Sequence, residues 1–279
     1  MPDWRPLIVR RKDGYPRIMG VINITPDSFF EDSRSNNISE TIKIAQSMIQ
    51  NGADWLDVGG ESTRPGADPV EEEEEISRVV PVIRELRKKF PGIGISVDTR
   101  RSEVAKLSLE EGADMINDVS ALSDENMINI IKQSDCYICL MHMKGLPGNM
   151  QDNPQYDDVV AEVRSRLNEK VSLLIREGID RERIIVDPGI GFGKLLEHNL
   201  LLLKSGREVI PLSNVKLMWG VSRKSMFSEL LGRIDARDRL AGTLGIAAMS
   251  KLKAVDIIRV HDVAEHADLF RAMSSLEDF

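Results

Sequence analysis

One strand end in this sequence has the residue types of a binding site. The segment 184–194 begins with three β-branched residues, continues with Asp187 and Pro188, and then carries three alternating glycines before Lys194. β-branched residues favour a strand, and Pro and Gly end it in a tight turn. A carboxylate in that turn is a strong hydrogen-bond acceptor for a ligand. The segment therefore predicts either a ligand site or an ordinary tight turn.

The glycines do not form a known phosphate loop. The spacing from Gly189 to Lys194 is one residue short of a P-loop, and Leu195 stands where that loop requires Ser or Thr. The dinucleotide-binding fingerprint fails as well, because Gly193 comes one residue early. A nucleotide-binding turn is therefore excluded at this strand end.

Polar residues stand at the ends of nearly all the apolar segments, which makes a site the better interpretation. They are Asn23, Glu61, Asp98, Asn117, His142, Asp187, Lys224 and Arg259. Any one of them could cap a helix, but capping does not explain their recurrence at nearly every strand end. Burying so many acids and amides is costly unless they meet a ligand, a metal or one another.

The elements that position these residues read as alternating strands and helices. Strands are expected over 17–22, 55–58, 93–97, 115–116, 137–141, 184–186, 215–219 and 257–258. Helical periodicity lies between most of them, over 39–50, 102–111, 124–133, 157–178, 236–253 and 263–274. This order predicts one α/β domain over 1–279, a single (β/α)8 TIM barrel, whose usual size is about 250 residues. The alternative, an open doubly wound sheet, normally has fewer strands and a recognisable nucleotide turn.

The acidic run Glu71–Glu75 follows Asp68 and Pro69 and predicts a solvated helix start. An N-cap, an early Pro and first-turn acids all favour a helix amino terminus. Cys136 and Cys139 have C-x-x-C spacing, but residues three apart on a strand face opposite sides. We therefore interpret them as buried small hydrophobes.

Composition limits the partners of the chain. Of its 279 residues 42% are hydrophobic, enough for a large core, and the net charge of −8 argues against a nucleic-acid surface. No apolar run is long enough to span a membrane, and no leader-like apolar segment follows the amino terminus. The expectation is a soluble, cytoplasmic protein.

Two cationic segments predict an anion site in this acidic chain. They are 222–225 and 259–262, at the seventh and eighth strand ends, where barrels frequently bind phosphate. Arg259, Lys224 and His261 together suit a diphosphate. The alternative is that Arg259 forms a salt bridge with Asp262. No metal motif occurs, so the metal expected here is a Mg²⁺ on Asn23 and on substrate phosphate oxygens.

His198 and His266 lie in helical stretches and read as surface or packing residues, whereas the type and spacing of His142 assign it no role.

Together these residues resemble the dihydropteroate synthase family, from about Ile18 to Val263. The matching segments are 20–29, 57–66, 96–99, 116–120, 141–143, 187–194, 222–225 and 258–263. The resemblance implies condensation of 6-hydroxymethyl-7,8-dihydropterin diphosphate with 4-aminobenzoate, giving dihydropteroate and diphosphate with Mg²⁺. Asp187 and Asn117 independently match the donors and acceptors of a pterin edge.

The resemblance also implies a role for each matching residue. Pterin would be bound by Asp98, Asn117, Met141, Asp187, Phe192 and Lys224. Diphosphate would be bound by Asn23, Thr63, Arg259 and His261, with the metal on Asn23. Aminobenzoate would contact Phe29, Thr63, Arg64, Pro65, Lys224 and Ser225. Catalysis would fall to Asp98, Asp187, Lys224, Arg259 and His261.

Some positions depart from the family, and other functions stay open. The loop after Phe29 continues with Phe30, Glu31 and Asp32, and bulky Trp219 ends the seventh strand, where it is expected to affect packing near the site. The loops 25–37 and 62–68 are expected to act as lids. The alternatives are a corrinoid-linked methyltransferase-like barrel and a non-catalytic pterin-binding barrel. Family members pair as homodimers, and here the apolar segment 240–252 is the expected surface.

Overall fold

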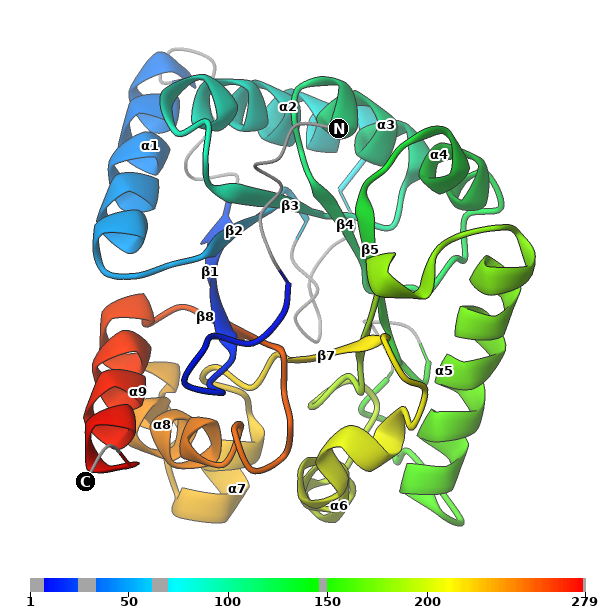
Figure 1. The fold of residues 1–279 in the computed structure, drawn as a ribbon, viewed down its shortest axis with the longest axis vertical. Coiled ribbons are helices and arrows are strands. Elements are labelled where there is room, and N and C mark those ends of the chain that lie inside the picture. The colour runs from blue at the N-terminus through cyan, green and yellow to red at the C-terminus, as the bar shows by residue number, and fades with distance from the viewer. Residues whose placement is uncertain (1–7, 25–33, 62–69, 146–149, 278–279) are drawn as a thin grey trace.

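Eight parallel strands close into a barrel in chain order, surrounded by helices (Figure 1). A computed structural model describes residues 8–24, 34–61, 70–145 and 150–277. The strands are β1 (Arg17–Asn23), β2 (Trp55–Gly59), β3 (Gly94–Asp98), β4 (Met115–Asp118), β5 (Tyr137–Met141), β6 (Ile184–Asp187), β7 (Lys216–Trp219) and β8 (Ile257–Val260). The predicted (β/α)8 barrel is confirmed.

The helices follow the strands in sequence and form the outer ring (Figure 1). They are α1 (Arg34–Gln50), α2 (Glu72–Lys89), α3 (Ser102–Glu110), α4 (Met127–Gln133), α5 (Val159–Arg176), α6 (Leu196–Ser205), α7 (Met226–Leu231), α8 (Leu240–Ala248) and α9 (Val263–Glu277). Short 3₁₀ helices are η3 (Arg181–Arg183), η4 (Gly206–Val209) and η5 (Ala236–Arg239).

The predicted boundaries of one helix and one loop were wrong. The expected helix over 236–253 is divided between η5 and α8, because Asp235 caps a 3₁₀ turn before the longer helix begins. The loop predicted over 25–37 ends earlier, since α1 already begins at Arg34. Its first residues are polar, so no apolar periodicity marked them as helical.

Alternation along the strands separates two apolar layers. One residue of each adjacent pair points outward and packs under the helices, as Leu56 and Ile258 do. The inward residues form a second cluster that fills the amino-terminal end of the barrel: Ile8, Met19, Trp55, Met115, Cys139, Ile185, Met218 and Ile257. The barrel interior is therefore a packed core at this end and not a channel.

The same alternation bears on two sequence expectations. Cys139 lies in the inner cluster and Cys136 in the outer one, and both are buried and outside any disulfide, as predicted. Trp219 is buried in the outer cluster, under the helices. Its place in the strand turns it away from the barrel interior, so the expected effect of its bulk on packing near Lys224 or Arg259 would act through the outer layer.

Three aspartates lock neighbouring strands together at the amino-terminal end. Asp54, Asp114 and Asp256 each precede a strand and accept a hydrogen bond from a backbone N–H of the adjacent strand. Each also pairs with arginine, as Asp54 does with Arg17 at 2.9 Å. Because a one-residue slip would break these contacts, they hold the register that the inward layers need.

The acidic run at the start of α2 contains one buried member. Glu71 to Glu74 are exposed, as predicted, but α2 begins at Glu72, later than expected, with Glu71 as its N-cap. Glu75 is 1% exposed and forms an ion pair with Arg101. The solvated interpretation of Glu75 was wrong because this turn of the helix faces the loop after β3.

The variant Gly94→Ala tests how tightly the inner layer is packed. A Cβ at Gly94 would lie 2.3 Å from the Trp55 ring, whereas a Cβ at Gly92 would meet nothing within 4 Å. We expect Gly94→Ala to lower the free energy of unfolding by about 1–3 kcal/mol, the usual cost of overpacking. Gly92→Ala should change it by less than about 0.5 kcal/mol. Urea denaturation measures both, and equal effects would contradict the assignment.

Candidate functional site

A polar layer lies directly above the apolar layer inside the barrel. The layer is built from residues that lie two positions further along their strands than members of the inner cluster: Asp57, Asn117, Met141, Asp187 and Arg259. Asp98 joins them from β3. Residues two apart on a strand face the same side, so these side chains converge at the carboxyl ends of the strands. This is the end of a barrel where ligands bind.

Arg259 holds this layer together. Its Nε donates to Asp57 Oδ2 at 2.6 Å, and its Nη2 donates to Asp98 Oδ2 at 2.7 Å. Asn117 Nδ2 donates to the same Asp57 oxygen at 3.2 Å. Burial opposes the charge on Arg259, yet the two carboxylates raise its pKa, so the guanidinium stays charged. One cation therefore bridges β8, β2 and β3.

The predicted alternative for Arg259 was wrong. Asp262 does not pair with Arg259 but with Arg223, at 2.5 Å. Arg259 sits inside the barrel and Asp262 just beyond the strand, so their side chains face different neighbours. Beside this pair, Ser222 Oγ lies 3.0 Å from His261 Nδ1. Two contacts therefore join the loops after β7 and β8, where cations were expected.

Asp187 caps the turn that follows β6. Its Oδ1 accepts the backbone N–H of Gly189 at 2.7 Å, and the side chain is 4% exposed. Burial raises the pKa of Asp187 and of Asp98, against the opposing effects of the nearby cations. A Cβ at Gly220 would lie 3.3 Å from Asp187 Oδ2, so β7 approaches this carboxylate closely.

An apolar cluster adjoins the polar layer. Met141 and Phe192 pack with Val119 and Met150, and Lys224 Nζ lies 3.9 Å from the Phe192 ring centroid. A cation at this distance over an aromatic face is attracted by the ring quadrupole. The structure thus brings together Met141, Phe192 and Lys224, three residues for which the resemblance implied pterin binding.

His142 is buried beside a lysine that is buried as well. Lys194 Nζ lies 3.0 Å from His142 Nδ1 and also donates to the backbone carbonyls of His142 and Phe192. Burial and the Lys194 charge lower the pKa of His142 to about 3, and burial lowers the pKa of Lys194 to about 7. His142 is therefore neutral and accepts from Lys194.

Glu61 does not join the polar layer, although the strand-end pattern included it. It accepts two hydrogen bonds from Arg100 at 3.1 Å and one from the backbone N–H of Val70. Arg101 also contacts the Val70 carbonyl and Glu75. These contacts join the loops after β2 and β3 beside the site.

The remaining predicted residues lie at the rim or outside the described part of the chain. Asn23 ends β1 and is exposed, and Ser225 is exposed at the start of α7. Outside the described residues are Phe29, Thr63, Arg64 and Pro65. His198 and His266 are buried in α6 and α9, as the packing interpretation predicted.

Sequence reasoning missed Asp57 and Lys194. Asp57 is fully buried, and its Oδ1 has no hydrogen-bond partner in the described structure. The signal was present, because Asp57 stands two residues after Trp55 and so shares its face. For Lys194 no sequence signal was available, since its partners lie in a different loop, 52 residues away at His142.

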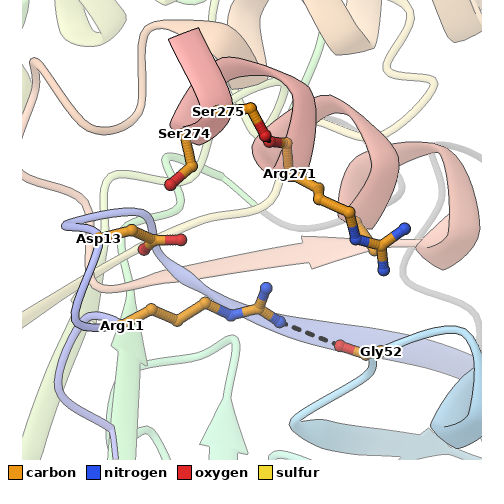
Figure 2. A pocket seen from close by; sticks show the side chains of 7 residues that line it. Arg11, Asp13, Gly52, Arg271, Ser274 and Ser275 are labelled. Atoms are coloured by element: carbon orange, nitrogen blue, oxygen red, sulfur yellow. Dashed lines mark hydrogen bonds between the residues drawn. The ribbon is translucent and has the colours of Figure 1, made fainter. Parts of the chain in front are cut away.

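A separate cavity of 270 Å³ lies at the other end of the barrel. Arg11, Asp13, Gly52 and the carboxyl end of α9 line it, and Figure 2 shows Arg11 bonded to the Gly52 carbonyl. Arg11 also pairs with Asp54 at 2.8 Å, and Arg271 pairs with Asp268. Because its arginines hold structural partners, this cavity does not compete with the polar layer as the candidate site.

Neither a protein-built metal cage nor a membrane helix occurs in the described chain. Its histidine, cysteine and acidic side chains form no group of three that would hold a metal. No helix in the same residues is both long and apolar enough to cross a bilayer.

Comparison with known proteins identifies relatives along nearly the whole chain. Residues 19–261 match the family model described as pterin binding enzyme. The chain is 45% identical over 264 residues to a dihydropteroate synthase of Neisseria meningitidis serogroup C, covering 94% of this chain and 93% of that protein.

Solved structures agree with the sequence comparison. The Yersinia pestis dihydropteroate synthase with a sulfonamide drug has a TM-score of 0.88 and 36% identity, covering 96% of this chain and 97% of that one. The Xanthomonas albilineans enzyme with 4-aminobenzoic acid has a TM-score of 0.87 and 38% identity, covering 95% and 94%.

The buried lysine predicts a pH-dependent stability. The pKa of Lys194 falls from 10.5 in the unfolded chain to about 7 in the folded one, so between these values only the unfolded chain holds the proton. Stability should rise with pH over this window, by at most about 1.4 kcal/mol per pH unit. Urea denaturation at pH 7 and pH 9.5 measures this gain. Lys194→Met should lack this contribution, and an unchanged pH slope in the variant would contradict the assignment.

Proposed function

The chain belongs to the dihydropteroate synthase family of pterin-binding enzymes, and from this premise we propose that it joins a dihydropterin diphosphate to 4-aminobenzoate inside the polar layer. The products are 7,8-dihydropteroate and diphosphate. The observation that carries the proposal is the charge balance of the layer: three carboxylates, Asp57, Asp98 and Asp187, converge with two cations, Arg259 and Lys224. An excess of negative charge suits a ring that becomes positive.

Pterin binding follows from the hydrogen-bonding groups of the layer. The aminopyrimidinone edge of a pterin presents adjacent donors and acceptors, which a carboxylate and an amide match. Asp187 and Asn117 supply these groups, and Met141 and Phe192 supply an apolar wall. Lys224, beside Phe192, donates to the ring carbonyl and nitrogen side of the pterin.

The reaction that this arrangement serves is dissociative. The C–O bond between the pterin methylene and diphosphate breaks first, and its electron pair leaves with the diphosphate. The pterin cation is stabilised by Asp98 and Asp187, whose carboxyl groups are already held in place by Arg259 and by the Gly189 N–H. The arylamine nitrogen then forms the C–N bond and releases a proton. Aminobenzoate is bound by Lys224, Ser225, Phe29, Thr63, Arg64 and Pro65, of which the last four lie outside the described residues.

The departing diphosphate is met by the cations of the last two strands. Arg259 uses Nε and Nη2 for the carboxylates, and its Nη1 group has no hydrogen bond to a described residue, so it is available to the anion. His261 adds a donor from the loop after β8, and Thr63 would add another. Binding two carboxylates and the diphosphate together would explain why Arg259 sits between them.

We expect a Mg²⁺ to be held by Asn23, because the described residues form no cage of protein ligands for a metal. Asn23 is exposed at the end of β1 and offers a hard amide oxygen, and Mg²⁺ typically takes few protein ligands and completes its shell with phosphate oxygens and water. When bound, the ion would neutralise charge on the diphosphate.

We also propose that the chain acts as a homodimer through α8. No residue of this nine-residue helix is charged, and only Thr243 and Ala247 are buried. Ala241, Gly245, Met249 and Leu252 form an exposed stripe at helical spacing, and Leu252 is 74% exposed. A second copy would cover this surface. We assign the enzyme to the cytoplasm, a compartment in which its two cysteines would stay reduced.

Product formation tests the function directly. Dihydropterin diphosphate and 4-aminobenzoate should give dihydropteroate with Mg²⁺, and removal of the ion with a chelator should abolish it. Asn23→Ala should need more Mg²⁺ for half-maximal rate. Absence of product with retained pterin binding would instead favour a methyltransferase-like or non-catalytic barrel.

Substitutions of Asp187 and of Arg259 should weaken the binding of different parts of the substrate. Asp187→Asn, which still accepts the Gly189 hydrogen bond, should weaken pterin with and without diphosphate by about 10- to 100-fold, the cost of a charged hydrogen bond. Arg259→Lys keeps a cation beside the carboxylates but loses the fork, so it should mainly reduce the extra affinity that diphosphate adds. Calorimetry with both ligands measures this, and equal losses of pterin affinity in the two variants would refute the division.

The dimer is tested with charges placed just after α8. Met249→Glu combined with Leu252→Glu should produce a monomer of 31.3 kDa in sedimentation equilibrium, because a buried unpaired charge opposes association. Leu276→Glu, at a residue 78% exposed on α9, is the control and should stay dimeric. A monomeric wild type would exclude this surface as a dimer interface.

A further inference from the structure

We propose that Lys194 is a positioning residue for the pterin, which ties the loop after β5 to the loop after β6 and so fixes the Phe192 ring. This inference deepens the proposed function and rests on it. Lys194 would not touch the substrate or the reacting atoms. It acts through the wall of the pocket.

Three hydrogen-bond acceptors surround the Nζ of Lys194. Nζ lies 2.9 Å from the Phe192 carbonyl, 3.3 Å from the His142 carbonyl and 3.0 Å from His142 Nδ1. Protonated, the amine has three N–H groups, and each has an acceptor here, whereas the neutral amine keeps two of these hydrogen bonds. Two of the acceptors belong to the end of β5 and one to the turn after β6, so the side chain bridges the two loops.

Packing alone does not explain a lysine at this position. Its side chain is 3% exposed and forms no ion pair with a carboxylate of the described chain. An apolar residue of similar volume would avoid the cost of burying the amine. The amine adds directional hydrogen bonds, which hold two carbonyls from separate loops at fixed distances.

The turn after β6 needs such an anchor. Gly189, Gly191 and Gly193 all have positive φ, a conformation that glycine adopts easily. None of the three has a side chain that could hold the turn in place. The glycine carbonyls have their own partners, since Gln151 donates to Gly191 and Tyr156 donates to Gly193. Lys194 is the side chain that holds the carbonyl of Phe192 in the described structure.

The loops are also too close for the turn to reorganise freely. A Cβ at Gly189 would lie 1.8 Å from the His142 carbonyl oxygen, and one at Gly193 would lie 2.2 Å from the Lys144 carbonyl oxygen. The two loops thus meet backbone to backbone. A shift of either loop would move Phe192, and with it the ring over which Lys224 Nζ sits at 3.9 Å.

A double-mutant cycle on pterin affinity tests the inference. Lys194→Met should raise the Kd for 6-hydroxymethyl-7,8-dihydropterin diphosphate about tenfold, and F192A should raise it by at least as much. The double variant should bind within about twofold of F192A alone, because Lys194 acts through Phe192. In turnover, Lys194→Met should raise KM for the pterin substrate with kcat within about twofold, as expected when uniform binding is lost.

Control variants separate positioning from stability. Lys204→Met removes an exposed lysine from α6 and should match the wild type in Kd and melting temperature. A circular dichroism melt of Lys194→Met establishes that the affinity is measured on folded protein. If Lys194→Met does not fold, the cycle is run with Lys194→Gln, which keeps an N–H donor and should give a smaller loss, again absent in the F192A background.

Three results would overturn the inference: wild-type affinity in folded Lys194→Met, additive losses in the cycle, or a fall in kcat with KM unchanged. Failure of the proposed function looks different. A wild-type protein that binds pterin but forms no dihydropteroate rejects the synthase while the cycle is still read from Kd. A wild-type protein that does not bind pterin rejects both.

Discussion

The arrangement of the site depends on one guanidinium between two buried carboxylates. Arg259 joins Asp57 and Asp98, which come from strands 202 and 161 residues away along the chain. Without it, the barrel would bury two carboxylates that have lost their hydrogen-bonded counter-charge, which costs several kcal/mol for each ion. With it, the charges are oriented toward the open end of the barrel before any ligand arrives. Folding of the barrel and assembly of the site are thus the same event.

Two layers of the barrel interior divide stability from function. The lower layer, with Trp55 and Met115, is apolar and closely packed, and Gly94 is small because Trp55 occupies the adjoining space. The upper layer is polar and carries groups that are costly to bury, including Asp57 with an unpaired oxygen. The cost of the upper layer is offset by the packing below it and by the aspartates that hold the strand register.

Much of the candidate site was predictable because a strand has a period of two and a barrel has one active end. Asp98, Asn117 and Asp187 were found as polar residues at strand ends, and the structure brings them into one layer. Side-chain partners were less accessible. Arg259 was expected either at an anion or with Asp262, and no local rule could indicate that Asp57 and Asp98 would receive it, because those contacts cross the barrel.

The sequence by itself determined the fold class, the strand order and the face that each strand residue presents, because these follow from local apolar periodicity and from the rule that parallel strands need crossover helices. Only the tertiary structure decided which charges meet. Glu75 was expected to be solvated, and neither Lys194 nor His142 was assigned a role, yet each is buried against a partner from another part of the chain. Pairing depends on distances across the closed barrel, and a one-dimensional pattern holds no record of those distances.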